Sequence, residues 1–287
     1  MKPDRQKYHN IFPEGLSLGG RIGITAILVS LMTLPFSYSM AVLPLLFFIV
    51  LCFTAPFLPG FSFFLPIISR GLPEKQAVAI TFDDGPDPAS TPALLHLLSR
   101  HQTPATFYVN GLRAKKYPDL IRKIVSLGHT IGNHSYNHDN FIMLKRTDTL
   151  KEEIEKTQQV LHHMGVFPLT FRPPVGVTNP KLDHVLKQVG IYVVNFSRRA
   201  GDMGNRKVRH LSEKILKKLR SGDIIMLHDI PPRNDDLTRC WLDEIDCLLT
   251  GIREKNLEIL PLSELIDRPV MGEQNRLSED SCQDNPN

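Results

Sequence analysis

Two adjacent carboxylates, Asp83 and Asp84, follow the apolar run 77–82 and precede Gly85-Pro86. Neighbouring side chains cannot easily share one partner, so two different roles are expected. One carboxylate can bind a metal ion, while the other acts as a base beside a cation. Asp-Asp-Gly-Pro is also a common turn sequence, and the pair alone indicates no more than a turn.

Two histidines, His134 and His138, lie four positions apart in His-Ser-Tyr-Asn-His. On one helical turn both imidazoles would face the same way, which suits a divalent metal ion. Position 135 is not Glu, so this is not the zinc-protease pattern in which that Glu is the base. The spacing alone is equally compatible with two surface or core histidines.

Arg172 and His228 are further candidates for chemistry. Arg172 precedes Pro173 and Pro174, which restrict the backbone, and its guanidinium can hold a carboxylate through two hydrogen bonds. His228 ends the apolar run 224–227. A histidine there is often structural, but its ordinary pKa lies near neutrality, so it can also serve as a general acid.

Alternating strand and helix patterns between residues 77 and 262 predict a mostly parallel sheet. About seven repeats favour closure into a barrel. We expect strands at 77–82, 105–109, 130–131, 169–171, 191–195, 223–227 and 258–260, and helices at 91–101, 118–127, 148–164, 179–189, 208–219 and 237–253. Catalytic groups of such folds collect at the carboxyl ends of the strands, where all the residues above lie.

Five motifs appear in the order found in one enzyme family. They are Thr81-Phe82-Asp83-Asp84-Gly85-Pro86, His134-Ser135-Tyr136-Asn137-His138, Arg172-Pro173-Pro174, Asp202 and Leu227-His228-Asp229. Over about 77–260 the chain resembles the polysaccharide deacetylases, also called the NodB-homology or carbohydrate esterase family 4 domain. The resemblance implies a distorted (β/α) barrel and a bound divalent metal, zinc first, with cobalt or nickel as alternatives.

The resemblance also implies roles for individual residues. Asp83 would be the general base and His228 the general acid, with Arg172 orienting the base and Asp202 raising the pKa of the acid. The metal ligands would be Asp84, His134 and His138. Substrate contacts would come from Pro173, from Leu227 in an acyl pocket, and from a backbone N–H near Tyr136 that stabilises the oxyanion.

The implied reaction is removal of an N-acetyl or similar N-acyl group from an amino sugar. Val175 and Met203 stand where the family commonly has an aromatic residue and a Trp, and Trp241 is the single Trp of the chain. Stacking on a long glycan is therefore weakened. We expect a lipid-linked saccharide as readily as a polymer.

The apolar segment 22–69 contains no Lys, Arg, Asp or Glu. It is long enough for two membrane helices, at about 22–36 and 41–57, with the piece 61–68 at the membrane interface. A cleaved signal peptide and a buried soluble hairpin are the alternatives. Basic residues before the segment predict that 1–21 is cytoplasmic. The sequence therefore predicts an integral membrane protein in contact with membrane lipids, and leaves open the side on which the enzyme lies.

The remaining features limit the function classes. The net charge of +4 is mild, and the basic run 206–220 lacks the interleaved aromatic residues of a nucleic-acid surface, so no nucleic-acid partner is expected. The polar tail 271–287 is predicted to be disordered. Two rival functions remain: a non-catalytic saccharide-binding membrane protein on the same fold, and a non-haem iron oxygenase, which also uses two His and one Asp.

Overall fold

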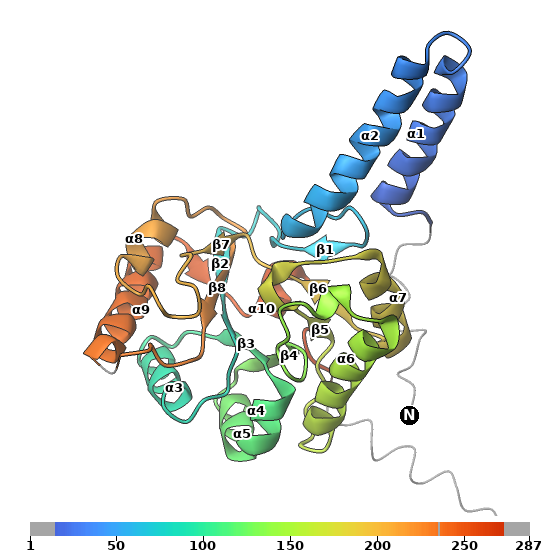
Figure 1. The fold of residues 1–287 in the computed structure, drawn as a ribbon. Coiled ribbons are helices and arrows are strands. Elements are labelled where there is room, and N and C mark those ends of the chain that lie inside the picture. The colour runs from blue at the N-terminus through green and yellow to red at the C-terminus, as the bar shows by residue number, and fades with distance from the viewer. Residues whose placement is uncertain (1–14, 235, 273–287) are drawn as a thin grey trace, which may run out of the picture.

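The computed structural model describes residues 15–234 and 236–272 (Figure 1). An α/β body carries a helical hairpin that projects from one side. Most of the predicted cytoplasmic segment 1–21 and nearly all of the predicted disordered tail 271–287 lie outside the described residues.

The body is built on a parallel sheet. Its strands are β1 Ile67–Ile68, β2 Ala77–Asp83, β3 Ala105–Val109, β4 Thr130–Asn133, β5 Thr170–Phe171, β6 Tyr192–Val194, β7 Arg198–Arg199, β8 Ile224–His228 and β9 Glu258–Ile259. The order is β1-β6-β5-β4-β3-β2-β8-β7, with β9 paired to β2, and every pair of these strands is parallel. The predicted parallel sheet is confirmed. Within the described residues, no pairing joins the two edge strands, β1 and β7. The sheet is therefore a curled half-barrel, and the predicted closure into a full barrel is wrong.

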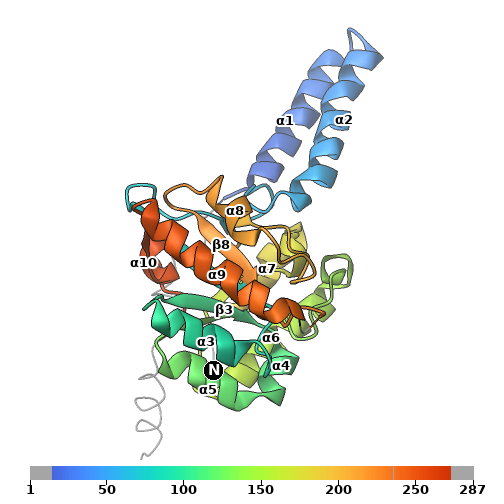
Figure 2. The same ribbon diagram turned by 90° about the vertical axis from the view of Figure 1, so that its left-hand side faces the viewer.

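Helices cover the outer face of the curled sheet. They are α3 Thr91–Arg100, α4 Gly111–Lys116, α5 Pro118–Ser126, α6 Thr147–His162, α7 Pro180–Val189, α8 Leu211–Leu216 and α9 Asp236–Glu254. The last helix, α10 Leu262–Ile266, packs instead with the inner cluster of Ala79 and Met226. In Figure 2, α3 and α9 lie in front of the sheet. Short elements such as α4 and α10, and the two-residue strands β1 and β7, were not predicted, because so few residues carry no periodicity.

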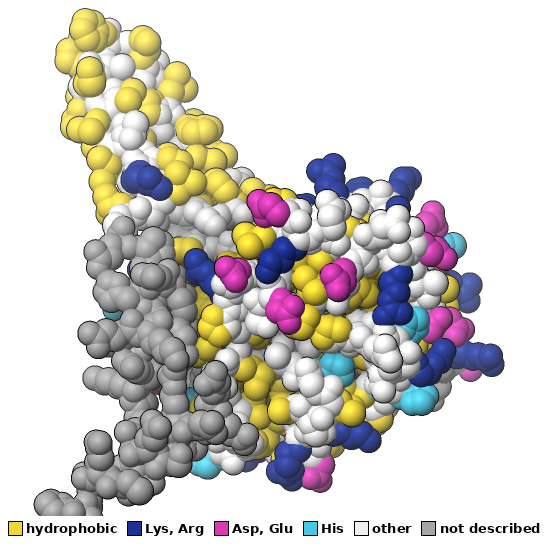
Figure 3. All heavy atoms as spheres, turned by 180° about the vertical axis from the view of Figure 1, so that it is seen from behind, with side chains coloured by type: hydrophobic (Ala, Val, Ile, Leu, Met, Phe, Trp, Pro, Cys, Tyr) yellow, Lys and Arg dark blue, Asp and Glu magenta, His cyan; other side chains and the backbone are white. Residues whose placement is uncertain are grey.

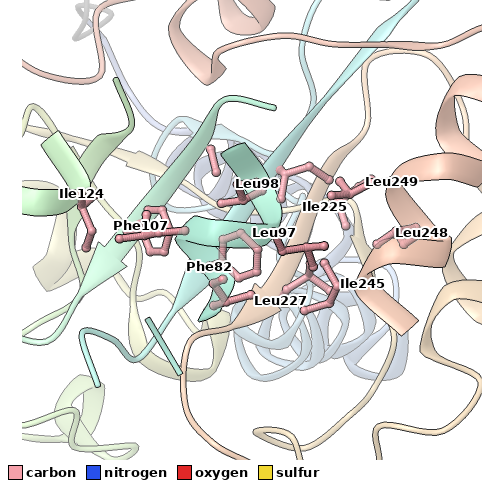
Figure 4. Close-up of a cluster of buried hydrophobic side chains, with 14 of the residues drawn as sticks. Phe82, Leu97, Leu98, Phe107, Ile124, Ile225, Leu227, Ile245, Leu248 and Leu249 are labelled. Carbon is pink, nitrogen blue, oxygen red and sulfur yellow. The ribbon is translucent and has the colours of Figure 1, made fainter. Parts of the chain in front are cut away.

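Alternation along the strands separates two buried faces. Phe82 and Leu227 lie on the helix-covered face, where the rings of Phe82 and Phe107 stack with centroids 5.2 Å apart (Figure 4). Ala79 and Met226 belong to the opposite, inner cluster. Successive side chains of a strand point to opposite faces, so the residues at positions 81, 83 and 228 share the inner face. The two-residue period of the strands therefore places the catalytic candidates on the inner face of the curled sheet.

The apolar hairpin consists of α1 Leu18–Thr33 and α2 Tyr38–Thr54, followed by the 3₁₀ turn η2 Ala55–Phe57. Its outward side chains are almost all hydrophobic (Figure 3). The helices pack closely where Gly23 faces the ring of Phe48. Among the described residues, Tyr38–Phe57 is one helix long and apolar enough to cross a membrane, and Leu18–Thr33 is a shorter apolar helix. The two predicted helices are present, each beginning about three or four residues earlier than expected.

The segment after the hairpin belongs to the body rather than to an interfacial helix. Phe63, Leu65 and Ile67 are buried. Ile67 and Ile68 form β1, which pairs with β6. The piece 61–68 is thus part of the folded body, and its position at a membrane interface stays a prediction. Leu65 and Ile67 complete one core cluster, and β1 supplies hydrogen bonds to the edge of the sheet.

Candidate active site

Parallel pairing brings the chemical groups to one edge of the sheet. Asp83 at the end of β2 is in register with Tyr108 of β3 and with His228 of β8. Asn133, the last residue of β4, is in register with Phe171 of β5. The next residues along these two strands are His134 and Arg172. Four strands therefore deliver their terminal side chains to one place, as the sequence predicted.

Asp84, His134 and His138 form a candidate metal centre. One ligand atom from each lies within 4.8 Å of the others. Nε2 of His138 is 2.9 Å, and Nε2 of His134 is 3.4 Å, from Oδ1 of Asp84. His134 Nδ1 lies 2.7 Å from the carbonyl oxygen of Arg172, which can only accept, so Nδ1 carries the proton. Nε2 of the neutral ring is then free to bind a metal.

The donor set fits a divalent ion. Oδ1 of Asp84 is buried and accepts no well-aligned hydrogen bond among the described residues, although two imidazole nitrogens crowd it. Two imidazoles and one carboxylate are ligands that zinc accepts, with positions left for water and substrate. Burial acts to raise the pKa of Asp84, but His134 and His138 outweigh it and hold that pKa well below its usual range. The carboxylate form needed for coordination is thus favoured.

The His134–His138 segment is a loop, not the helical turn we expected. Ser135 and His138 have positive φ angles of 65° and 54°. This left-handed backbone folds the chain back, so that the two histidine rings lie 4.9 Å apart. The structure thus brings both histidines to Asp84, through a left-handed loop rather than the single helical turn that the spacing would allow.

Glu153 of α6 holds this loop, although no pattern in the sequence indicated it. Its Oε2 accepts hydrogen bonds from the backbone N–H groups of Tyr136 at 3.1 Å and Asn137 at 2.8 Å. Its Oε1 accepts from Asn137 Nδ2 at 2.5 Å. Glu153 is only 9% exposed. A charged residue on an amphipathic helix is typical of a solvated position, so its burial carried no signal in the sequence.

The same contact corrects one expectation about Tyr136. Its backbone N–H already donates to the Glu153 carboxylate, so it is not free to bind an oxyanion in this arrangement. The half-buried Tyr136 ring packs close to Gly111. Tyr136 therefore joins the ligand loop to α4 and α6.

Arg172 clamps Asp83 from inside the sheet. Its Nη1 donates to Asp83 Oδ1 at 2.6 Å and to Thr81 Oγ1 at 2.7 Å. The guanidinium is fully buried and stacks 3.9 Å above the centroid of the Tyr108 ring. The second oxygen of Asp83 points towards the metal centre, 4.0 Å from His134 Nε2. One oxygen is thus anchored and the other is available to a water molecule in the site.

His228 and Asp202 make the second charged pair. His228 Nδ1 lies 2.7 Å from Asp202 Oδ2. Burial acts to lower the pKa of His228, but the hydrogen bond and charge of Asp202 outweigh it and raise that pKa to about 9. Asn205 ties the loop to the strand, because its Nδ2 donates to the carbonyls of His228 and Ile230. The imidazolium is therefore held with Nε2 free.

Asp229, the residue after His228, is a buried structural carboxylate. It accepts hydrogen bonds from Ser90 at 2.7 Å and Thr91 at 2.6 Å, at the start of α3. Burial raises its pKa to about 7, although the hydrogen bonds from Thr91 and Ser90 act to lower it. Its side chain also packs against Gly85. Asp229 thus braces the loop that follows β2 and begins with Asp84.

Leu227 and Pro173 were also expected to contact the substrate, and both side chains are buried. Leu227 is 1% exposed and lies with Phe82 in the core on the helix-covered face. Because side chains alternate along a strand, Met226 and not Leu227 shares the inner face with His228. The predicted role of Leu227 in an acyl pocket is therefore wrong. Pro173 is buried beside Arg172. Trp241, the single Trp of the chain, is fully buried in the core and has no exposed ring face on which a sugar could stack.

Comparison with known proteins is consistent with this geometry. The model of the polysaccharide deacetylase family matches residues 70–194. The peptidoglycan N-acetylglucosamine deacetylase PgdA of Listeria monocytogenes is 30% identical over 202 residues, which cover 70% of this chain. The match spans only 41% of that relative's length.

Two further comparisons cover most of the matched protein. The chitooligosaccharide deacetylase of Azorhizobium caulinodans is 35% identical over 161 residues, which cover 55% of this chain and 76% of that one. The crystal structure of the peptidoglycan N-acetylglucosamine deacetylase Bc1960 superposes with a TM-score of 0.65 at 28% identity. The superposition covers 71% of this chain and 94% of that chain.

Proposed function

Because this chain belongs to the polysaccharide deacetylase family, we propose that it is a carbohydrate N-deacetylase that hydrolyses an N-acetyl or similar N-acyl group on an amino sugar. The observation that carries the proposal is the convergence of three units at one sheet edge. They are the metal triad, the Asp83–Arg172 pair and the His228–Asp202 pair.

Asp84, His134 and His138 are the residues that would hold a divalent metal, for which we propose zinc, with cobalt or nickel as alternatives. When bound, such an ion polarises the acyl carbonyl and lowers the pKa of a coordinated water molecule. Both effects lower the barrier to attack on an amide, which is otherwise a poor electrophile.

The chain's own residues move the protons. Asp83, anchored through one oxygen by Arg172, accepts a proton from the attacking water with the other oxygen as the water oxygen bonds to the acyl carbon. As the carbon–nitrogen bond breaks, His228 donates its proton to the departing nitrogen. A pKa of about 9 keeps His228 protonated at neutral pH, as a general acid requires. The products are one carboxylate and one free amine.

The rival functions are less well supported. The chain retains the metal triad, the proposed base and the proposed acid together, which argues against a protein that only binds saccharide. The iron oxygenases with two His and one Asp use a β-barrel, whereas the named strands of this sheet are all parallel.

For substrate and location, we propose an N-acylated glycan of the peptidoglycan or chitooligosaccharide type, or a lipid-linked amino sugar. We also propose that the hairpin α1–α2 anchors the enzyme in a membrane. An antiparallel pair of spans leaves the segment before α1 and the body on the same side of the bilayer.

The test is to incubate the full chain, with zinc or cobalt, with N-acetylated chito-oligomers, peptidoglycan fragments and lipid-linked N-acetylglucosamine. We expect equal amounts of carboxylate and primary amine from at least one of them. No release from any of the three would contradict the proposal.

A further inference from the structure

A group of exposed hydrophobic side chains lies on the loops that follow β4 and β5 and at the end of the hairpin. We call the apolar rim the following set, given with exposed fractions: Phe57 69%, Leu58 53%, Phe141 69%, Leu144 80% and Val175 51%. Phe141 is the third residue after His138, and Val175 is the third after Arg172. Solvent contact by so many large apolar side chains is costly, and grouped exposure of this kind marks an interaction surface.

The apolar rim is continuous with the hairpin. The backbone N–H of Thr178 donates to the carbonyl of Pro56 at 3.4 Å, and Asn195 Nδ2 donates to the carbonyl of Pro59 at 2.8 Å. Asn179 Nδ2 then donates to the carbonyl of Met143 at 2.6 Å. In both ribbon views α7 lies close to the base of the hairpin (Figures 1 and 2). The end of α2, the loop after β5 and the loop after β4 therefore form one connected face.

The opposite edge of the body lacks such a group. In the described part of the body, the large exposed hydrophobics away from the strand carboxyl ends are Leu72 and Leu127. They are separate residues, one before β2 and the other before β4. Single exposed apolar residues are ordinary on soluble proteins. Leu112 at 49% and Met203 at 59% are also exposed and lie outside the rim, so the rim is the set of exposed hydrophobics that adjoins the hairpin.

We infer that the apolar rim lies in the lipid interface of the membrane that holds the hairpin. The metal site then opens at the bilayer surface and takes the amino-sugar head of a lipid-linked saccharide. This inference rests on the proposed deacetylase function and on the hairpin as anchor. A bilayer is the occupant indicated, because the rim continues an apolar helix of membrane-spanning length.

The first test measures immersion without using activity. Full-length Leu144→Trp and its control Leu127→Trp are reconstituted in phosphatidylcholine–phosphatidylglycerol vesicles, with and without brominated lipid. The native Trp241 is fully buried and gives a common background. We expect brominated lipid to remove about half of the emission added at position 144 and little of that added at position 127. Equal quenching at the two positions would overturn the inference.

The second test concerns the substrate. In the same vesicles, wild type and Phe141→Ser/Leu144→Ser are compared on lipid-linked N-acetylglucosamine and on a water-soluble chito-oligomer, with Leu127→Ser as the control. We expect the ratio of lipid-linked to soluble rate to fall about tenfold in the double variant and to stay unchanged in the control. An unchanged ratio in the double variant would overturn the substrate assignment.

The two tests separate the possible failures. If wild type releases no amine from either substrate while brominated lipid quenches the Leu144→Trp variant, the deacetylase function fails and the lipid contact stands. If amine is released but the emission added at position 144 is not quenched, the function stands and the lipid contact is wrong.

Discussion

Asp83 and Asp84 are adjacent in the chain but face different partners. The backbone of Asp84 has a positive φ of 74°, which turns its side chain to the histidines, while Asp83 remains on β2 beside Arg172. The backbone therefore fits the proposed division between Asp83 as base and Asp84 as ligand. Such strain at a non-glycine residue is tolerated where function requires it.

Replacing Asp83 by Asn separates these roles. The change removes the proton acceptor but leaves all three proposed ligands. We expect metal binding to change by no more than a few fold, while the rate of amine release falls by about 10²–10⁴. Metal titration and product assays on the same preparation provide the check. A variant with the wild-type rate would show that another group is the base.

Replacing Asp202 by Asn should move the alkaline limb of the rate profile. In wild type, activity that needs protonated His228 is lost as pH rises through about 9. Without Asp202, burial still lowers the pKa of His228 and its main opposing effect is gone, so the limb should shift to lower pH. Rates across the pH range decide this, and an unmoved limb would contradict the role of Asp202.

The same shift affects stability. A raised histidine pKa stabilises the fold fully below the ordinary value of about 6.5, and this contribution is lost as pH rises through the folded value. Stability from the His228–Asp202 pair should therefore decline towards pH 9 in wild type only. Thermal unfolding of wild type and Asp202→Asn at a series of pH values measures the difference.

Glu153 should act through the ligand loop. Glu153→Gln keeps the size of the side chain but loses the charged acceptor of two backbone N–H groups. We expect metal affinity to fall about tenfold, as for other residues that support ligands. Glu152→Gln, on the exposed side of α6, is the matched control. Equal metal affinities in the two variants would refute a positioning role for Glu153.

At the scale of elements, the carboxyl ends of β2, β4, β5 and β8 converge because the sheet is parallel. Sequence periodicity predicted these strands and the long helices α3, α5, α6, α7 and α9 to within a few residues, since each buries one regular face. It overextended α8, predicted from 208 to 219. The helix occupies only Leu211–Leu216, and it begins at Leu211 because the preceding residue, His210, has a left-handed φ of 60°.

The loop after β2 depends on a close contact that only Gly permits. A Cβ on Gly85 would lie 2.3 Å from Asp229 Oδ2. We expect Gly85→Ala to destabilise the folded state by about 1–3 kcal/mol, because the buried Asp229 side chain must move.

Thermal unfolding in detergent measures this effect. Gly20→Ala is a control, since a Cβ there meets nothing nearer than 3.5 Å. If both variants unfold at the wild-type temperature, the loop after β2 is not braced by Asp229.

At the scale of the whole molecule, the order of the motifs predicted which residues meet at one sheet edge, but not that β1 forms the outer strand of the sheet. Edge strand β1 and the buried Phe63 and Leu65 lay inside what resembled an uncharged membrane segment. Core and membrane sequences are both apolar, so composition could not separate them. Likewise the burial of Glu153 is set by tertiary packing, which leaves no local pattern, and the motif that contains Asp229 did not indicate its contacts with Ser90 and Thr91.

The central claim is metal-dependent deacylation by this site. The most direct measurement is amine and acetate release from an N-acetylated amino sugar by the full chain, before chelation, after chelation, and after zinc or cobalt is restored. We expect release to be lost with the chelator and regained with the metal, while Asp83→Asn stays inactive throughout. Release that persists unchanged in fully chelated enzyme would contradict it.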